Sequence, residues 1–376
     1  MPTLDLVDCG TLYRNPLPGH QLIHASVPSV LELSPQEFLC VYRRGSAFYA
    51  ADGVLETVRS TDGGKTWQEV GLVWRPDRDN RPYSYSAPSL TRLADGSLVL
   101  TAIRRDGSDP SRLAVNPDTG GFLPVETLLF RSSDSGRTWS APEVIQIPGR
   151  QIVDISGPVV ELNDGRWFLP FDLGKAYDDP RPVRAVMIGL FSSDGGRTWG
   201  NRVTLADGTA DGKGYWHGRV VKLLDGRLFT LLWTADRATG QFLSIHRTVS
   251  DPHGRNWSPP EPTDIPGQTS WAVDVGDGRM VAIYTYRDGK QPGINAVASL
   301  DGGRTWDLDH QVRLWDAGGR ETIGVASTTT YPQSHDVIAF GKPQAIRTSD
   351  GDVMASFWCT ESCVTHARWA RLRLSS

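Results

Sequence analysis

Side chains that could bind or transform a sugar stand at both ends of short apolar segments in this 376-residue chain. Aromatic rings can stack on the CH faces of a pyranose, and cationic side chains can fix its hydroxyl or carboxylate groups. The candidates at the start of an apolar run are His24, Tyr85, Trp216, His217, Arg219, Trp271 and Lys342. Those at the end of one are Arg43, Arg44, Arg104, Asp172, Tyr286, Arg287 and Glu361. The histidines are candidate general bases, and the two carboxylates are candidates for acid–base work.

Each of these residue types also has a plain structural use. A hydrogen-bonded structural His is as common as a catalytic one, and Lys342 could be solvated or salt-bridged at the surface. Tyr85, in the segment RPYSYSAP, fits core packing better than a binding role. A binding site is favoured only if the fold gathers the segment ends at one place.

The sequence lacks the motifs that hold a metal or a common cofactor, namely HExxH, CxxC, a phosphate-binding loop and a dinucleotide fingerprint. We therefore expect no cofactor and no metal ion. Lys and Arg total 39 and Asp and Glu 43, and this balance gives no footprint for nucleic acid or an anionic membrane. The expected partner is a glycan or oligosaccharide, and the oligomeric state stays open.

No segment is typical of membrane insertion or export. No apolar run approaches the ~18 residues of a membrane span, and MPTLDLVDCGTLYR lacks the basic and apolar regions of a signal peptide. Four Cys are too few for a disulfide framework in a chain of this length. We expect a cytoplasmic protein with reduced thiols, and a Cys359–Cys363 bridge is the alternative.

One pattern, Ser-x-Asp-x-Gly-x-x-Trp, recurs along the chain, and we call each copy a box. Its copies run from Ser60 to Trp67, Ser132 to Trp139, Ser192 to Trp199 and Ser299 to Trp306, and a degraded copy runs from Ser250 to Trp257 with Pro252 in place of the Asp. Ser and Asp side chains can hydrogen-bond the amides of a tight turn, Gly supplies a positive φ, and Trp covers the turn. Copies at repeat spacing indicate architecture rather than catalysis or calcium binding.

A hairpin of two apolar segments around a turn, usually Asp-Gly, precedes each box. Six such hairpins occur, among them APSLTRLADGSLVLTAI and GRVVKLLDGRLFTLLW, and β-branched alternation around Asp-Gly is a strong hairpin signal. We predict an all-β, six-bladed β-propeller of four-stranded antiparallel blades that fills residues 1–376 as a single domain. The segment from Leu4 to Tyr13 would pair with the C-terminal strand and close the ring.

This topology gathers the candidate residues at one face. We number the four strands of each blade from the axis of the propeller outward. The Asp-Gly turns join the first strand to the second and the boxes join the third to the fourth, so both lie on one face of the propeller. The connections from the second strand to the third, and from the fourth strand to the next blade, lie on the opposite face. Those connections are long and polar, as in 104–127 and 307–341, and long loops in a compact fold are usually functional. We expect the site at the mouth of the central channel on that face, within reach of His335 and Asp336.

The boxes and hairpins together resemble the sialidase superfamily of six-bladed propellers over essentially the whole chain. Where sialidases place the first Arg of a carboxylate-binding triad, in an Arg-Ile-Pro motif, this chain has Ser26. The positions of the nucleophilic Tyr, of the Glu that activates it and of a second triad Arg hold Lys342, His217 and Trp233. The resemblance therefore implies a carbohydrate-active propeller but not an ordinary sialidase reaction.

Asp52 is the one position that resembles the family's catalytic set. Sialidases carry their acid/base Asp on the first connecting loop of this kind, after a charged pair, and here Arg43 and Arg44 precede Asp52-Gly53. The resemblance implies an acid/base role for Asp52. A plain Asp-Gly turn explains the same residues equally well.

Three functions fit these observations. The first is an exo-acting glycoside hydrolase on a terminal sugar, neutral or acidic, with Asp52 as the acid and Asp172, Asp154 or Glu361 as the second carboxylate. The second is a polysaccharide lyase on a uronic acid, with His217 or His24 as the base, assisted by Tyr85 and the Arg104/Arg105 pair. The third is a glycan-binding propeller without catalysis.

Overall fold

Antiparallel β-sheets make up nearly all the regular structure of the protein. The structure is a computed structural model that describes residues 2–147, 153–155, 157–287, 291–318 and 338–375. In these ranges the only helix is the 3-10 turn η1 (Pro76–Arg78), and no helix there has the length and apolar character to cross a bilayer. His335 and Asp336 lie outside the described residues.

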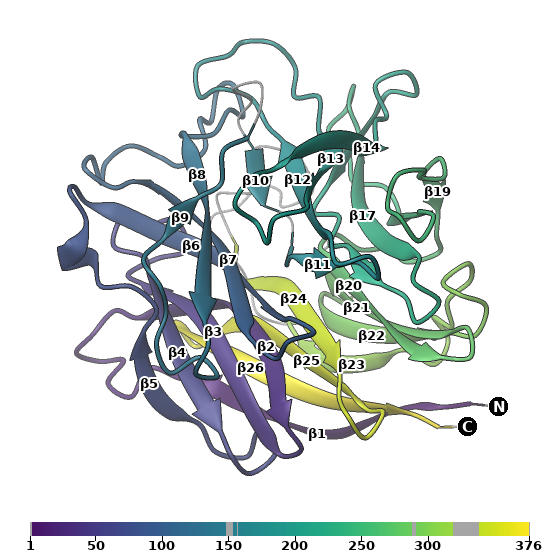
Figure 1. The fold of residues 1–376 in the computed structure, drawn as a ribbon, viewed down its shortest axis with the longest axis horizontal. Coiled ribbons are helices and arrows are strands. Elements are labelled where there is room, and N and C mark those ends of the chain that lie inside the picture. The colour runs from purple at the N-terminus through teal and green to yellow at the C-terminus, as the bar shows by residue number, and fades with distance from the viewer. Residues whose placement is uncertain (1, 148–152, 156, 288–290, 319–337, 376) are drawn as a thin grey trace.

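The strands form small antiparallel sheets in a β-propeller arrangement, so the predicted all-β propeller is confirmed. Figure 1 shows the sheets following one another around a centre in chain order, from purple to yellow. The hydrogen bonds of the described residues divide the strands into five sheets rather than six. Four of these sheets have four or five strands, and the fifth has eight because one parallel pairing, His24 with Thr365, joins two groups of four.

The bounds of the strands are as follows. The eight-stranded sheet contains β1 (Leu4–Tyr13), β2 (His24–Ser34), β3 (Glu37–Gly45), β4 (Val54–Ser60), β5 (Gln68–Leu72), β24 (Phe340–Arg347), β25 (Val353–Glu361) and β26 (Val364–Leu374). The next two sheets in the chain contain β6 (Tyr83–Arg92), β7 (Leu98–Asp106), β8 (Val125–Ser132) and β9 (Glu143–Val144), and then β10 (Val153–Ile155), β11 (Val160–Glu161), β12 (Trp167–Leu173), β13 (Val186–Ser192) and β14 (Gly200–Ala206). The last two contain β15 (Lys213–Trp216), β16 (Val221–Lys222), β17 (Leu228–Asp236), β18 (His246–Val249) and β19 (Glu261–Pro262), and then β20 (Ser270–Gly276), β21 (Arg279–Tyr286), β22 (Gly293–Ser299) and β23 (Val312–Asp316).

The two ends of the chain pair with each other. Strand β1 runs antiparallel to β26, from the pair Leu4–Leu374 to the pair Tyr13–Ala367, and the termini lie side by side in Figure 1. The predicted pairing of the N-terminal and C-terminal strands is therefore confirmed, with the predicted bounds. This pairing covers an edge of β26 that would otherwise expose a row of unpaired backbone groups.

The boxes connect the third and fourth strands of their sheets and work as turns. In the first box the Ser60 hydroxyl accepts the Gly64 N–H at 2.9 Å, and Asp62 accepts both the N–H and the hydroxyl of Thr66. These bonds, led by that from the Thr66 hydroxyl, lower the pKa of Asp62 to about 2. In the degraded copy Asp251 accepts the N–H of Asn256, the counterpart of Thr66, at 3.3 Å and that of Arg255 at 3.0 Å. An Asp one position earlier thus takes over the role of the lost one.

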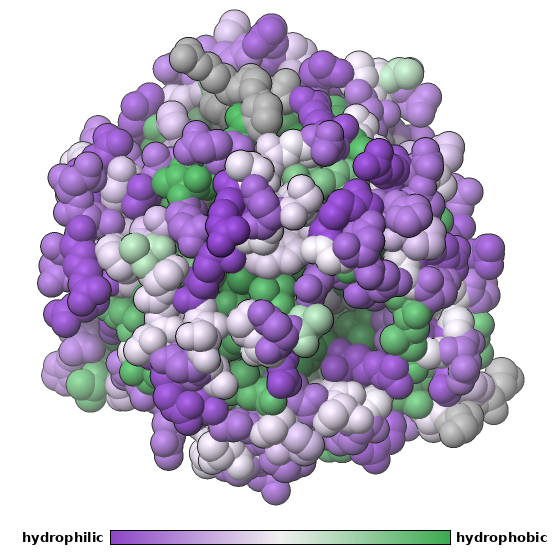
Figure 2. Space-filling model, viewed as in Figure 1, coloured by the Kyte–Doolittle hydropathy of each residue, from purple (hydrophilic) through white to green (hydrophobic). Residues whose placement is uncertain are grey.

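Apolar side chains from neighbouring sheets pack between them and form the core. One cluster joins Leu39 and Val41 of β3 to Leu98 and Leu100 of β7, and others join successive sheets in the same way. This packing explains the near-continuous apolar runs of the middle strands, which are covered on both faces. Figure 2 shows that hydrophilic side chains cover most of one face of the molecule, with apolar residues visible toward its centre.

Candidate active site

A pocket lies where strands from the different sheets converge. Four sheets contribute strand residues to its lining, and Thr269 and Arg287, which flank β20 and β21, come from the fifth. Its described lining residues are Phe48, Tyr49, Ser86, Ile103, Arg105, Ala114, Gly120, Phe122, Leu123, Val125, Asp172, Leu173, Gly174, Lys175, Val183, Trp216, His217, Trp233, Phe242, Thr269, Arg287, Ile338 and Lys342. The expected gathering of strand ends at one place is therefore observed.

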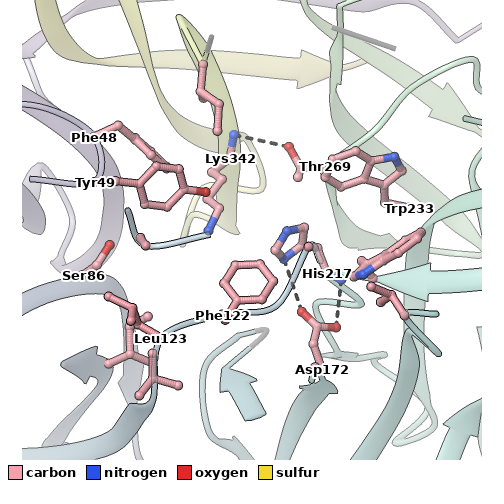
Figure 3. A pocket seen from close by; sticks show the side chains of 18 of the residues that line it. Phe48, Tyr49, Ser86, Phe122, Leu123, Asp172, His217, Trp233, Thr269 and Lys342 are labelled. Carbon is pink, nitrogen blue, oxygen red and sulfur yellow. Dashed lines mark hydrogen bonds and ion pairs between the residues drawn. The ribbon is translucent and has the colours of Figure 1, made fainter. Parts of the chain in front are cut away.

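A histidine–aspartate pair forms one wall of the pocket (Figure 3). The Asp172 carboxylate, near the end of β12, accepts the backbone N–H of His217 at 3.0 Å through Oδ1, and its Oδ2 lies 3.3 Å from the imidazole Nδ1. The second contact has the distance of an ion pair without the alignment of a full hydrogen bond. Because Nδ1 faces Asp172, the carboxylate favours the tautomer with hydrogen on Nδ1 and leaves Nε2 able to take a proton.

The pair is buried and His217 is held neutral. Only 16% of the His217 side chain and 8% of the Asp172 side chain are exposed. Burial lowers the pKa of His217 below its usual 6.5, and the Asp172 carboxylate opposes that shift. The imidazole also stacks on Trp233, with ring centroids 5.6 Å apart. A neutral, oriented imidazole at the wall of a pocket can act as a general base at neutral pH.

Irregularities in the inner strands aim His217 and Lys342. Both residues have a positive φ, of 51° and 44°, and Val27 and Ala87 adopt the same conformation in β2 and β6. At Val27, Ala87 and Lys342 the pairing register of the strand shifts, as in a β-bulge. Bulges change the direction of side chains at functional sites. The positive φ of His217 and Lys342 therefore directs these two side chains toward the pocket.

The charged side chains of the described lining are mostly cationic. Arg105, Lys175, Arg287 and Lys342 line the pocket, and Asp172 is the one carboxylate among its described residues. Arg287 donates to the Phe340 carbonyl at 2.9 Å, and the Lys342 backbone N–H donates to the Thr269 hydroxyl at 3.3 Å. An anionic ligand would therefore meet a favourable potential here.

Aromatic side chains supply much of the remaining wall. They are Phe48, Tyr49, Phe122, Trp216, Trp233 and Phe242. Phe48 and Tyr49 lie on the loop after β3, and the buried Arg43 holds that loop by donating to the carbonyls of Ala47 at 2.7 Å and Ala50 at 2.9 Å. Arg105 donates to the same Ala50 carbonyl at 2.9 Å. These guanidinium groups fix the position of two aromatic rings that face the pocket.

Five of the predicted site residues line the pocket, namely Asp172, Trp216, His217, Arg287 and Lys342. His217, Trp233 and Lys342 occupy three of the four positions at which the chain departs from the sialidase pattern, and the structure brings them together. Ser26, at the fourth, is fully buried in β2. The positions inferred from the resemblance therefore meet in space even though their residue types differ from the family pattern.

The other predicted residues lie outside this lining, which omits Asp52, Glu361, His24, Arg43, Arg44, Tyr85, Arg104, Arg219, Trp271 and Tyr286. Asp52 is exposed in the turn after β3, where its carboxylate accepts the Ser46 N–H at 3.0 and 3.1 Å. Glu361, at the end of β25, lies 3.1 Å from His366 and 3.7 Å from Arg368. Asp154 lies opposite Asp172 in the register of β10 and β12.

Packing between sheets accounts for several of these positions. Tyr85 is buried, and its hydroxyl donates to Asp79 at 2.8 Å. Trp271 is buried in the core, and the buried Arg219 lies over its ring at 5.8 Å. Tyr286 is half-buried and packs against a neighbouring core cluster. Large rings at strand ends were needed here to fill space between blades.

Ion pairs and burial account for the positions of the other predicted residues that do not line the pocket. Arg44 pairs with Glu56 at 2.8 Å and Arg104 with Glu126 at 2.6 Å. His24 lies behind the pocket wall, with its ring 5.9 Å from Phe48, and burial, followed by the charge of Arg43, lowers its pKa to about 4. Within the Arg104/Arg105 pair, only Arg105 lines the pocket, because neighbouring residues of a strand point to opposite faces.

Sequence reasoning missed the loop residues of the pocket. Phe48, Tyr49, Phe122 and Phe242 lie between strands rather than at their ends. The available signal was the presence of aromatic side chains in connections predicted to lie on the functional face. That signal identifies no single residue, because the path of a loop depends on contacts far away in the chain.

Comparisons with known proteins agree with the propeller fold. Residues 107–354 match a family described as BNR repeat-like domain, and residues 58–69 match one described as BNR/Asp-box repeat. A sialidase of Micromonospora viridifaciens is 26% identical over 254 residues, which are 59% of this chain and 36% of that protein. A sialidase of Bacteroides fragilis (strain YCH46) is 24% identical over 301 residues, which are 71% of this chain and 52% of that protein. The chain thus spans about half or less of the length of these relatives.

Solved structures share the fold at low sequence identity. A protein of unknown function from Dyadobacter fermentans has a TM-score of 0.74 at 20% identity, with both chains covered completely. The NanB sialidase of Streptococcus pneumoniae has a TM-score of 0.64 at 13% identity, covering 97% of this chain and 70% of that one. At these identities the likeness concerns the fold alone.

Proposed function

Because the chain belongs to the BNR repeat-like domain family, and so to the sialidase-like superfamily, we propose that it is a carbohydrate-active enzyme whose substrate is a glycan that contains an acidic sugar. Four cationic side chains in the described lining support the acidic sugar. The aromatic wall supports a pyranose ring, since rings stack on its CH faces. The His217–Asp172 pair supports catalysis rather than binding alone.

The reaction that this pocket supports best is β-elimination at a uronic acid. His217 Nε2 removes the proton on the ring carbon next to the carboxylate, and that electron pair forms a carbon–carbon double bond. The bond from the adjacent carbon to the glycosidic oxygen breaks, and the leaving oxygen takes a proton from Tyr49 or water. Arg105, Arg287 and Lys342 offset the carboxylate charge, which makes the abstracted proton more acidic. The paired, neutral imidazole is the observation that carries this proposal.

Hydrolysis of a terminal acidic sugar is the second candidate, and the sialidase relatives favour it. In that reaction Asp172 would be the carboxylate at the sugar, with Asp52 or Glu361 as the partner if either moved into the pocket on binding. Both reactions require a sugar with a carboxylate. Elimination needs a uronic acid whose C4 oxygen carries the neighbouring sugar, whereas hydrolysis removes the terminal sugar itself, so the products distinguish the two reactions.

We further infer that the propeller has six blades in one domain. The eight-stranded sheet counts as two blades, β2 to β5 and β24 to β26 with β1, because a single residue pair links them. Each of the other four sheets then supplies one blade. Those with five strands contain an inner strand that is interrupted, as between β15 and β16, which both pair with β17.

The test is turnover of acidic oligosaccharides by the purified protein and by His217→Ala. Elimination creates an unsaturated uronide that absorbs in the short-wavelength ultraviolet, whereas hydrolysis releases a reducing end without that absorbance. We expect the absorbance with the native protein, its loss in His217→Ala, and its retention in His310→Ala, which changes an exposed His paired with Asp307 at 2.9 Å. Reducing ends without absorbance would replace elimination with hydrolysis. Binding without either product would show that the protein is a glycan-binding propeller.

A further inference from the structure

Three metal-ligand side chains converge at the end of the β25–β26 hairpin, apart from the described pocket lining. Cys359 and Glu361 are two residues apart on β25 and so point to the same face of the strand. His366 on β26 is paired directly with Cys359 in the strand register. The β-sheet itself therefore holds a thiol, a carboxylate and an imidazole side by side.

The separations of the donor atoms suit a small divalent ion. His366 Nε2 lies 3.4 Å from Cys359 Sγ and 3.1 Å from Glu361 Oε2, and no two of the three donor atoms lie more than 4.8 Å apart. Tetrahedral zinc binds sulfur at about 2.3 Å and nitrogen or oxygen at about 2.0–2.2 Å, which places its ligand atoms roughly 3.2–3.6 Å from one another. The distance of 3.4 Å from His366 to Cys359 has this spacing, and the distance of 3.1 Å from His366 to Glu361 is slightly shorter. A small movement of the Glu361 side chain adjusts its distances to both other ligands.

The surroundings orient the ligands. Cys359 is fully buried and His366 is 5% exposed, so both are fixed in the interior. The other carboxylate oxygen of Glu361 accepts the Trp315 indole N–H at 2.8 Å and lies 3.7 Å from Arg368. These partners turn Oε2 toward His366. Outer groups that hold a ligand in this way are typical of metal sites.

The ligands change protonation in a simple way on binding. A neutral imidazole is the form that binds a metal, and a thiol releases its proton when it becomes a ligand. The chemistry of both side chains is therefore compatible with metal binding.

We propose that Cys359, Glu361 and His366 form a binding site for a divalent transition metal, with zinc the best match. Thiolate, imidazole and carboxylate are the three ligand types that zinc combines, whereas calcium and magnesium prefer oxygen alone. Binding forms the sulfur–metal bond and releases the Cys359 proton to solvent. The fourth tetrahedral position is then left to a water molecule or a further donor. None of these three residues takes part in the proposed elimination reaction.

Cobalt substitution tests the proposal, because a cysteine thiolate bound to Co²⁺ gives a charge-transfer band in the near ultraviolet. The purified full chain is stripped with a chelator, loaded with Zn²⁺ or Co²⁺ and dialysed, and bound metal is measured by elemental analysis. We expect about one equivalent per chain, the thiolate band with Co²⁺, and a rise in the unfolding temperature on loading. Less than a tenth of an equivalent retained would overturn the proposal.

Variants identify the ligands. Cys359→Ser should abolish the thiolate band, and His366→Gln and Glu361→Gln should reduce retained metal. Cys40→Ser, which changes another fully buried cysteine, and Cys363→Ser, which changes the exposed one in the same hairpin, should leave the band intact. If Cys359→Ser fails to fold, the His366→Gln and Glu361→Gln variants decide. A band that survives in Cys359→Ser, or full metal retention in the other two, would refute the assignment.

Discussion

Asp172→Asn is the substitution that tests most directly how the pocket works. Asp172 makes two contacts with His217, at the backbone N–H (3.0 Å) and at Nδ1 (3.3 Å). Asparagine has nearly the same shape, and its carbonyl oxygen can still accept the backbone N–H. Its amide NH₂ then faces Nδ1, which must become an acceptor, so the imidazole hydrogen moves to Nε2. The atom that should take the substrate proton is then already protonated.

The expected loss follows from the role of a general base. Such a base contributes about 10²–10⁴-fold to the rate, which corresponds to roughly 3–5 kcal/mol of activation free energy. The folded state loses much less, because one charged acceptor is exchanged for a neutral one at a cost of about 1 kcal/mol. We therefore expect kcat to fall by about 10²–10⁴-fold in a protein whose unfolding midpoint in urea changes little.

The assay is turnover of an acidic oligosaccharide that the native protein cleaves, measured as a function of pH. Because burial lowers the pKa of His217, the base form persists through neutral pH, and activity of the native protein should fall only below about pH 6.5. Asp172 opposes that shift, so Asp172→Asn should move the acid limb of the residual activity to still lower pH. Asp164→Asn is the matched control, since Asp164 lies 3.7 Å from His253 at the surface.

Two results would refute this reasoning. Activity of Asp172→Asn within a few-fold of the native value would mean that the tautomer of His217 is unimportant. A shift of the acid limb to higher pH would mean that the titrating group is not His217. Equal losses in the two Asp→Asn variants would point to a general effect of removing a carboxylate.

Three further changes test the fold and its electrostatics. Burial lowers the pKa of His24 to about 4, so the unfolded chain takes up this proton first, and up to about 3 kcal/mol of stability should be lost as the pH falls from about 6.5 to 4. His24→Phe should flatten this part of the pH profile of urea unfolding. An unchanged profile would mean that His24 does not cause the loss of stability. Gly196→Ala adds a Cβ that would lie 2.8 Å from Trp167 at a φ of +83°, whereas at Gly195, with a φ of +71°, nothing lies within 4 Å. Urea unfolding should therefore show Gly196→Ala to be about 1–3 kcal/mol less stable than Gly195→Ala, and equal stabilities would contradict the packing. Deleting residues 2–13 removes β1 and exposes an edge of β26, so gel filtration should show concentration-dependent association, and a fully monomeric, equally stable product would exclude this role.

Local sequence patterns allowed much of the fold to be predicted. Asp-Gly turns between β-branched segments gave the hairpins, and the boxes gave the turns between third and fourth strands, because both are decided by interactions within a few residues. Even the degraded copy folds as a box, since Asp251 accepts the Asn256 N–H, which is the amide hydrogen bond that the missing Asp would have taken. The number of separate sheets was less predictable, because the pair His24–Thr365 that merges two groups joins residues from opposite ends of the chain.

The candidate site, like the fold, combines features that the sequence predicts with features that depend on tertiary packing. The sequence by itself determined that His217, Asp172 and Lys342 stand at strand ends and that the sialidase residues are replaced. Only the tertiary structure decided that His217 meets Asp172, that Asp52 serves a turn, and that Phe48 and Tyr49 face the pocket. The physical reason is that hairpins and boxes are fixed by neighbours in sequence, whereas the contact of His217 with Asp172 spans 45 residues and two sheets. Such contacts depend on how the sheets pack around the centre, which no local pattern encodes.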